Sequence, residues 1–162
     1  SLTLSPCRRC TLFHVIIPLQ GKEGTRRLRI RRSANDDLRY VIVAGSSMAP
    51  LVLESKKSIF VVVESELDGF LIFQEAGNMA GVIAMGSASA KPDVAAHALL
   101  IKSEKILNSL DYDPAGARAA WKFWPETYGA KVIRWPVPIG KDPSDAWQQG
   151  LNICDWIEAG LE

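Results

Sequence analysis

The chain has 162 residues, of which 48% are hydrophobic, so it suits one domain, or a compact domain with a small appendage, and can bury a substantial core. Its 19 basic and 18 acidic residues leave a net charge of +1, which identifies no class of partner. No apolar run approaches the roughly 20 residues of a membrane-spanning helix, and no secretory signal pattern opens the chain. We therefore expect a cytoplasmic protein with no membrane partner.

Residues 1–57 are predicted to form a small, basic, β-rich subdomain. Three strands are expected, over residues 12–19, 27–31 and 39–44. The second strand alternates strictly, and a period of two puts Arg27, Arg29 and Arg31 on one face. Such a face suits a nucleic-acid backbone or a nucleoside triphosphate. The alternative is a solvated edge strand whose charges keep other chains from pairing with it.

The cysteine pattern says little about this region. Three cysteines do not make a disulfide framework, so a reducing compartment is expected. Cys7 and Cys10 have the spacing of half a zinc ribbon, with His14 as a candidate third ligand. A structural zinc site needs four ligands, and the sequence has no second cysteine pair, so we do not expect zinc in this chain.

From Ser58 onward strands and helices alternate, which predicts an α/β fold with a parallel sheet flanked by helices. We place the boundary between the two domains after residue 57, so that the second domain covers 58–162. Its strands are expected over residues 59–63, 81–85, 105–110 and 131–135. Its helices are expected over residues 67–76, 92–102 and 115–123, around 146–147, and over 153–159.

Acidic residues directly follow two of these strands. Glu64 comes after the first strand, and Asp111 and Asp113 come after the third. Ligands of open α/β sheets bind at the carboxyl ends of the strands, where converging carboxylates offer an all-oxygen site for a hard cation such as Mg²⁺. Residues i and i+2 of an extended segment point the same way, so both aspartates can face one ion. The pattern indicates phosphate chemistry, with nucleic acids or nucleotides as substrates.

Helix capping is the alternative explanation of these acids. Negative charge near a helix N-terminus is favourable by ~0.3–1 kcal/mol. This gain accounts for one of the acids that follow the first strand, such as Asp68. Asp113 before Pro114 is likewise an ordinary helix start. Capping explains neither Asp111 nor the presence of acidic residues after both strands, so we favour a functional site.

At these residues the sequence resembles a Toprim domain, the metal-binding module of DNA primases, topoisomerases and several nucleases. The match is closer to bacterial-type primases, and the sequence as a whole resembles primase-like proteins of phages and integrating elements. Four segments carry the resemblance, in order: Glu64–Asp68, Met85–Ala88, Leu110–Gly116 and Gly140–Pro143. It spans about residues 58–150. Residues 12–57 resemble, more faintly, the small basic subdomain that precedes Toprim in the primase catalytic core.

The resemblance implies a nucleotidyltransferase, the catalytic core of a DNA primase, which polymerises ribonucleotides on single-stranded DNA with two Mg²⁺ or Mn²⁺ ions. Its implied partners are single-stranded DNA, nucleoside triphosphates and a helicase or a zinc-binding domain, in association with the nucleoid. Glu64, Asp111 and Asp113 would be catalytic, with Glu64 a metal ligand or a general acid/base. The implied metal ligands are Glu64, Asp68, Asp111, Asp113 and Asp142. The implied nucleic-acid or nucleotide contacts are Arg27, Arg29, Arg31 and Lys141.

Departures from the family pattern leave other functions open. Ser65 stands where the family usually has glycine, and Ser144 replaces an acid, so one peripheral metal contact is expected to be missing. The sequence includes neither a full zinc-binding domain nor a helicase domain, so we expect a catalytic-core fragment or a protein that acts with partners. The alternatives are a Toprim nuclease, which uses the same carboxylates to activate water, and a nucleic-acid-binding module without turnover.

Overall fold

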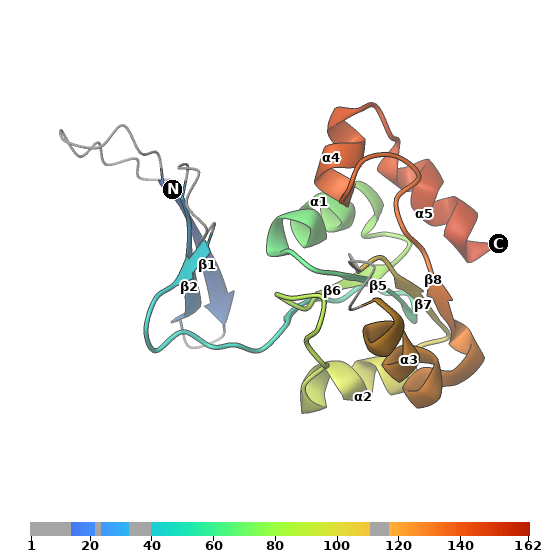
Figure 1. The fold of residues 1–162 in the computed structure, drawn as a ribbon, viewed down its shortest axis with the longest axis horizontal. Coiled ribbons are helices and arrows are strands. Elements are labelled where there is room, and N and C mark those ends of the chain that lie inside the picture. The colour runs from blue at the N-terminus through green and yellow to red at the C-terminus, as the bar shows by residue number, and fades with distance from the viewer. Residues whose placement is uncertain (1–13, 22–23, 33–39, 111–116) are drawn as a thin grey trace. The chain divides into compact units, whose positions relative to one another are not determined.

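The computed structural model divides the chain into two compact units, which meet between Met48 and Ala49. The described residues are 14–21, 24–32, 40–110 and 117–162 (Figure 1). We predicted the boundary after residue 57, and the structure puts it earlier. The reason is the short strand β4 (Leu51–Leu53), which pairs antiparallel with a strand of the larger sheet and so belongs to the second unit.

The first unit contains a three-stranded antiparallel sheet. Its strands are β1 (His14–Gly21), β2 (Gly24–Arg32) and β3 (Tyr40–Ile42), in the order β1-β2-β3. The three strands expected from the sequence are confirmed. Because β2 is paired on both sides, the arginine-bearing strand is a central strand, and the edge-strand alternative is excluded.

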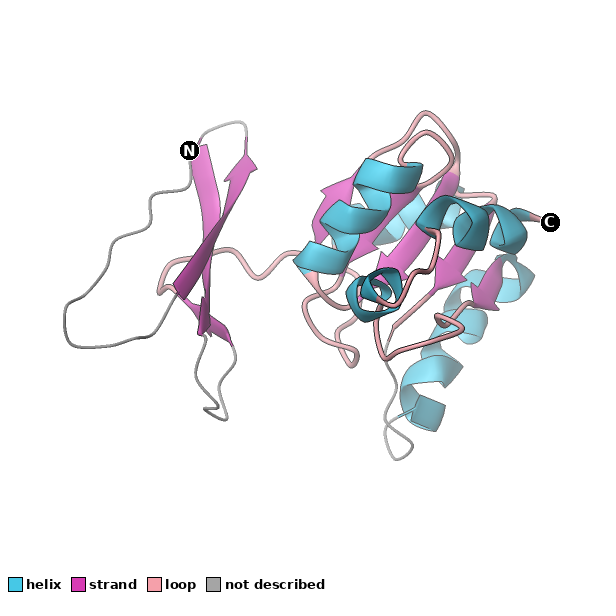
Figure 2. Cartoon of the chain, turned by 90° about the horizontal axis from the view of Figure 1, so that it is seen from above, coloured by secondary structure: helices cyan, strands magenta, loops and turns pink. Residues whose placement is uncertain are grey.

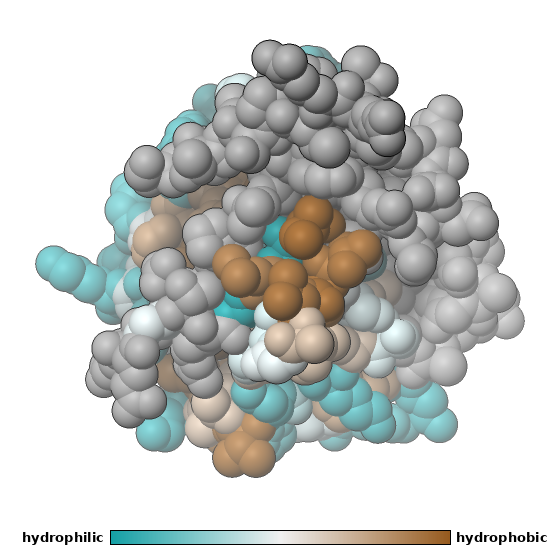
Figure 3. Space-filling model, turned by 90° about the vertical axis from the view of Figure 1, so that its left-hand side faces the viewer, coloured by the Kyte–Doolittle hydropathy of each residue, from teal (hydrophilic) through white to brown (hydrophobic). Residues whose placement is uncertain are grey.

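Apolar residues of β2 and β3 lie opposite one another in this sheet. Ile30 pairs with Val41, and the backbone N–H of Val43 donates to the carbonyl of Leu28 over 3.0 Å. Val41 keeps 38% of its surface exposed. Hydrophobic residues gather near the centre of the face that Figure 3 shows.

The second unit is built on a five-stranded sheet with the order β4-β6-β5-β7-β8. Four of its strands run parallel, and β4 runs antiparallel to β6. The parallel strands are β5 (Ile59–Val63), β6 (Gly81–Ala84), β7 (Lys105–Asn108) and β8 (Val132–Arg134). These are the four strands predicted from the sequence, and the α/β fold is confirmed.

Helices cover both faces of this sheet (Figures 1 and 2). On one face lie α1 (Glu66–Ala76), α4 (Pro143–Gln148) and α5 (Ile153–Leu161). On the other lie α2 (Val94–Lys102) and α3 (Ala117–Tyr128), which is followed by a short 3₁₀ turn, η1 (Gly129–Lys131). Four of the helices begin at a side chain that accepts a backbone N–H bond, namely Ser65, Asp93, Asp142 and Asn152. Among the described residues, no helix is both long and apolar enough to cross a membrane.

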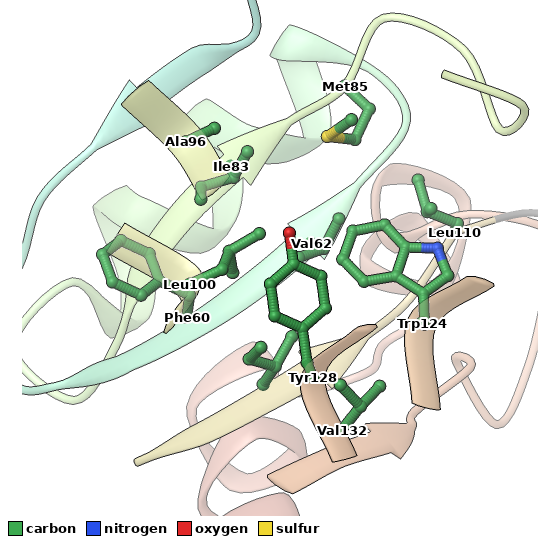
Figure 4. Close-up of a cluster of buried hydrophobic side chains, with 11 residues drawn as sticks. Phe60, Val62, Ile83, Met85, Ala96, Leu100, Leu110, Trp124, Tyr128 and Val132 are labelled. Atoms are coloured by element: carbon green, nitrogen blue, oxygen red, sulfur yellow. The ribbon is translucent and has the colours of Figure 1, made fainter. Parts of the chain in front are cut away.

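The main core lies between the sheet and the α2/α3 layer. Phe60 and Val62 of β5 belong to one buried cluster with residues of both helices, and on α3 the rings of Trp124 and Tyr128 lie 5.6 Å apart (Figure 4). The Tyr128 hydroxyl is 2.9 Å from Nδ1 of His97 on α2, so the two helices are linked by a hydrogen bond as well as by packing. Burial raises the pKa of Tyr128 to about 12.

The opposite face of the sheet packs closely under α1 and α5. A Cβ atom on Gly160 of α5 would lie 2.8 Å from Cδ1 of Leu107 and 2.8 Å from the indole of Trp135. The backbone of α5 therefore approaches the sheet more closely than a residue with a side chain allows. Since the neighbouring Val61 and Val63 are fully buried, β5 is covered on both faces, as strands of parallel sheets usually are.

Two lysines, one in η1 and one in β7, satisfy the carboxyl ends of two helices. Nζ of Lys131 donates to the carbonyls of Leu100, Ile101 and Ser103 at the end of α2, over 2.7, 2.6 and 3.0 Å. Nζ of Lys105 donates in the same way to the last turn of α5. A positive charge is favourable there because the unpaired carbonyls carry the negative end of the helix dipole. Burial nevertheless lowers the pKa of Lys131.

Lys131→Met is expected to lower the free energy of unfolding by about 1–2 kcal/mol, since three carbonyls lose a charged donor. Urea denaturation at neutral pH measures this loss. The matched control is Lys122→Met, because Lys122 keeps 73% of its side chain exposed in an i,i+4 ion pair and should contribute less than about 0.5 kcal/mol. Equal losses in the two variants would contradict the helix-end assignment.

The raised pKa of Tyr128 predicts a loss of stability in alkali. The unfolded phenol ionises near pH 10, whereas the folded phenol stays protonated until about pH 12, so the free energy of unfolding falls as pH rises through this window. Absorbance titration at a phenolate wavelength should show a component near 12 that Tyr128→Phe removes. The assignment is wrong if the component removed titrates near 10.

Candidate active site

Strands β5 and β7 are neighbours in the sheet, and the helices that follow them lie on opposite faces. After β5 the chain continues into α1 on one face, and after β7 it reaches α3 on the other (Figure 1). Ligands of open α/β sheets bind where connections from neighbouring strands diverge in this way. The acids singled out in the sequence follow these two strands, which is why this edge is the candidate site.

Backbone hydrogen bonds from the residues that follow both neighbouring strands fix the end of β5. Gly86 N–H donates to the carbonyl of Glu64 over 2.7 Å, and Ser109 N–H donates to that of Val62 over 2.8 Å. In the parallel register, Val62 pairs with Asn108. Glu64 is thus the first residue beyond a buried strand. It is half-buried, and hydrogen bonds fix its backbone at the switch point.

Asp111 and Asp113 lie outside the described residues. The structure describes the chain as far as Leu110, whose N–H donates to Oδ1 of the buried Asn108 over 3.1 Å. Within the described ranges, no three Asp, Glu, His or Cys side chains gather closely enough to hold a metal ion. Glu64 supplies a carboxylate of the type that a hard cation prefers. A complete ligand set needs the two aspartates, and metal binding by these residues stays a prediction.

Asp68 is surrounded by protein donors. Its Oδ2 accepts the hydroxyl of Ser65 over 2.5 Å, and its Oδ1 accepts both the backbone N–H of Ser144, over 3.0 Å, and the Ser144 hydroxyl. Asp68 keeps 6% of its surface exposed. We call Ser65, Asp68 and Ser144 the Asp68 cluster. It joins the start of α1 to the start of α4, and a role of Asp68 as a metal ligand stays a prediction.

Asp142 and Lys141 lie just before α4. Asp142 caps this helix through Oδ1, which accepts from the N–H of Asp145 over 2.8 Å, while Oδ2 lies 4.0 Å from Nζ of Lys141. The side chain of Lys141 is 63% exposed. Because Ser144 bonds to Asp68, this segment is held near the end of β5, so the structure brings the predicted Asp68 and Asp142 into one neighbourhood.

The predicted arginine face is less uniform than its sequence. Arg27 is buried, with 4% of its surface exposed, and its Nε donates to the carbonyl of Ser47 within the first unit. Arg29 is half-buried, and the side chain of Arg31 lies outside the described residues. Cys7, Cys10 and the side chain of His14 are outside them too. Arg27 therefore supports the fold of its own unit, and nucleic-acid contact by these arginines stays a prediction.

Ser65 and Ser144 are the site residues whose role the sequence analysis missed. In the sequence both are departures from a family pattern, and neither has a predicted contact. The spacing of Ser65 and Asp68 is that of a capping box, a sequence signal that could have identified the first contact. Nothing local indicates the second, since Ser144 reaches Asp68 only through the packing of α4 on α1.

No family model and no curated protein matches the sequence. Solved structures do match it. The Aquifex aeolicus primase, with its zinc-binding and RNA polymerase domains, aligns with a TM-score of 0.64 and 20% identity over 96% of this chain and 42% of that one. The RNA polymerase domain of the Mycobacterium tuberculosis primase, in complex with a double-stranded DNA oligomer with a 6-nucleotide overhang, gives 0.65 and 16% over 93% and 53%.

The primase fragment of the bacteriophage T7 primase-helicase gives a TM-score of 0.59 and 16% identity, over 93% of this chain and 63% of that one. The chain thus spans between 42% and 63% of the length of these proteins. At such identities the comparison shows the fold. It is the fold of bacterial and phage primase catalytic cores, and the resemblance stated from the sequence is confirmed.

Proposed function

We propose that the chain acts as the catalytic core of a DNA primase and polymerises ribonucleotides on single-stranded DNA. One observation carries the proposal: Glu64 and the aspartate pair follow the two neighbouring strands at the switch point of a sheet that has the primase fold. The pattern in the sequence and the topology of the sheet are independent supports, because the pattern contains no information on strand order.

The residues at this edge of the sheet have separate proposed roles in phosphoryl transfer. We assign Glu64, Asp111 and Asp113 to divalent cations, with Asp142 beside them, and Glu64 also as a candidate general acid/base. When bound, Mg²⁺ or Mn²⁺ supplies activation of the primer 3′-hydroxyl and charge stabilisation of the departing pyrophosphate. The N–H of Asp145 holds the carboxylate of Asp142, and the hydrogen bond from Gly86 to the Glu64 carbonyl fixes the backbone from which the Glu64 side chain extends.

Nucleic acid is the proposed partner. The similar domain from Mycobacterium tuberculosis is in complex with a DNA duplex that has a single-stranded overhang. In this chain we assign phosphate contacts to the arginine-bearing strand β2 and to the exposed Lys141. Arg27 contributes by supporting the sheet from within, since its Nε donates to Ser47.

Glu64→Gln, Asp111→Asn and Asp113→Asn are each expected to reduce primer synthesis at least about 100-fold, because each removes a charge that holds a cation. The measurement is incorporation of labelled ribonucleotides on single-stranded DNA with Mg²⁺ or Mn²⁺. Glu104→Gln is the matched control: Glu104 is exposed, precedes β7 at the opposite edge of the sheet, and should leave synthesis unchanged.

The same reactions are examined for cleavage of the template. Primer synthesis that EDTA abolishes supports the proposal. Cleavage without synthesis would replace the primase by a nuclease that uses the same carboxylates. Binding of DNA with neither product, by a chain supplemented with both cations, would leave a nucleic-acid-binding module.

Arg31→Gln and Lys141→Gln are each expected to weaken binding of single-stranded DNA about 3–10-fold at low salt. Each lost phosphate contact should also reduce the slope of log K against log salt by about 0.7. Fluorescence anisotropy of a labelled oligonucleotide across a salt series measures both. Lys57→Gln, in the exposed turn before β5, is the control with the same change of charge. Equal losses for Lys57→Gln would show a non-specific effect of net charge.

A further inference from the structure

We infer that Asp68 does not bind a cation in this chain and is instead a positioning residue. With Ser65 and Ser144 it forms a metal-independent tether between α1 and α4, and this tether places Lys141 and Asp142 at the site. The significance of Lys141 and Asp142 rests on the proposed function. The tether itself rests on the hydrogen bonds of the Asp68 cluster.

The first argument is the occupation of the carboxylate. Oδ1 of Asp68 faces two donors from Ser144, and Oδ2 faces the hydroxyl of Ser65. A cation bound to these oxygens would meet the hydrogens of three donors. Mg²⁺ also keeps several of its waters, and a carboxylate of a residue with 6% of its surface exposed leaves little space for them.

The second argument is the chemical nature of residue 144. A carboxylate at this position would face Asp68 directly, and two like charges in contact need a cation or a proton between them. With Ser144 neither a cation nor a proton is needed between the two side chains. The Ser144 hydroxyl donates to Oδ1 of Asp68, so neutral donors satisfy the charge of the carboxylate. The pair is complete without a metal.

The third argument is what the tether holds. The N–H of Ser144 belongs to the first turn of α4, where backbone donors have no partner within the helix, so Asp68 satisfies one of them from α1. Asp142 satisfies another, from Asp145. Ser65 directly follows Glu64 along the chain and caps α1. The tether therefore connects Asp142 to the end of β5, and its loss frees the segment that carries Lys141.

Thermal unfolding in EDTA and in Mg²⁺ tests the tether. Asp68→Ala and Ser144→Ala should each lower the Tm by about 5 °C, equally in both buffers. Asp68→Asn should lower it far less, because an amide oxygen still accepts from Ser144 and the amide nitrogen can donate to Ser65. The control is Ser89→Ala, in an exposed loop, with no expected change. Losses confined to the Mg²⁺ buffer would overturn the inference.

Calorimetric titration with Mn²⁺ separates positioning from ligation. Asp68→Ala should weaken Mn²⁺ binding about 3–10-fold by displacing Asp142, and Asp68→Asn should restore wild-type affinity within about two-fold, whereas Asp111→Asn should lose at least about ten-fold. A loss in Asp68→Asn equal to that in Asp111→Asn, with its Tm unchanged, would make Asp68 a ligand. An unchanged affinity in Asp68→Ala would refute the positioning role.

Ser144→Asp provides the converse signature. By setting a carboxylate against Asp68, it should lower the Tm in EDTA and make it rise with Mg²⁺ by several degrees more than in the wild type. A wild-type protein that rises as much as this variant would contradict the inference. If the wild type binds no Mn²⁺ at all, the proposed metal site fails, while the Tm changes in EDTA still decide whether the tether exists.

Discussion

The arrangement of the second unit depends on the burial of β5. This strand is hydrogen-bonded to β6 on one side and β7 on the other, and Val61, Val62 and Val63 are fully buried beneath helices on both faces. With both edges paired and both faces covered, only the strand's ends approach solvent. Glu64 is the first polar residue beyond that buried segment. Its place at the candidate site is thus a consequence of the packing that stabilises the sheet.

Most of this fold could be read from the sequence, because its signals are local. The alternation of strands and helices predicted the four parallel strands, and the helix expected over residues 92–102 is α2, which begins at its cap Asp93. Strand β4 was missed because three residues carry no measurable period, and its pairing with β6 is a long-range contact. Because β4 belongs to the second unit, the domain boundary lies before this strand and not after residue 57. Helix α3 also extends beyond the predicted end, since it continues through Pro125 to Tyr128, where the aromatic packing against α2 holds its last turn.

The candidate site was predictable to the extent that it follows from strand ends. Glu64 lies where the pattern put it, whereas alternation along β2 predicted which face carries Arg27 but not its burial. That burial goes with a hydrogen bond to Ser47, in a loop beyond the next strand. The partner of Asp68 was equally hidden, because Ser144 meets it only after α4 packs on α1. In both cases the missing information is tertiary.

Helix capping accounts for some of the acids that the sequence singled out and not for others. Asp93 caps α2 and Asp142 caps α4. Asp68 accepts hydrogen bonds from donors at the starts of α1 and α4. Each of these carboxylates accepts a backbone N–H from the first turn of a helix, which fixes the helices around the switch point. Glu64 instead belongs to a strand end, with backbone bonds to its carbonyl. These acids therefore stabilise the helix starts around the candidate site. Capping does not fully explain Glu64 or the aspartate pair after β7.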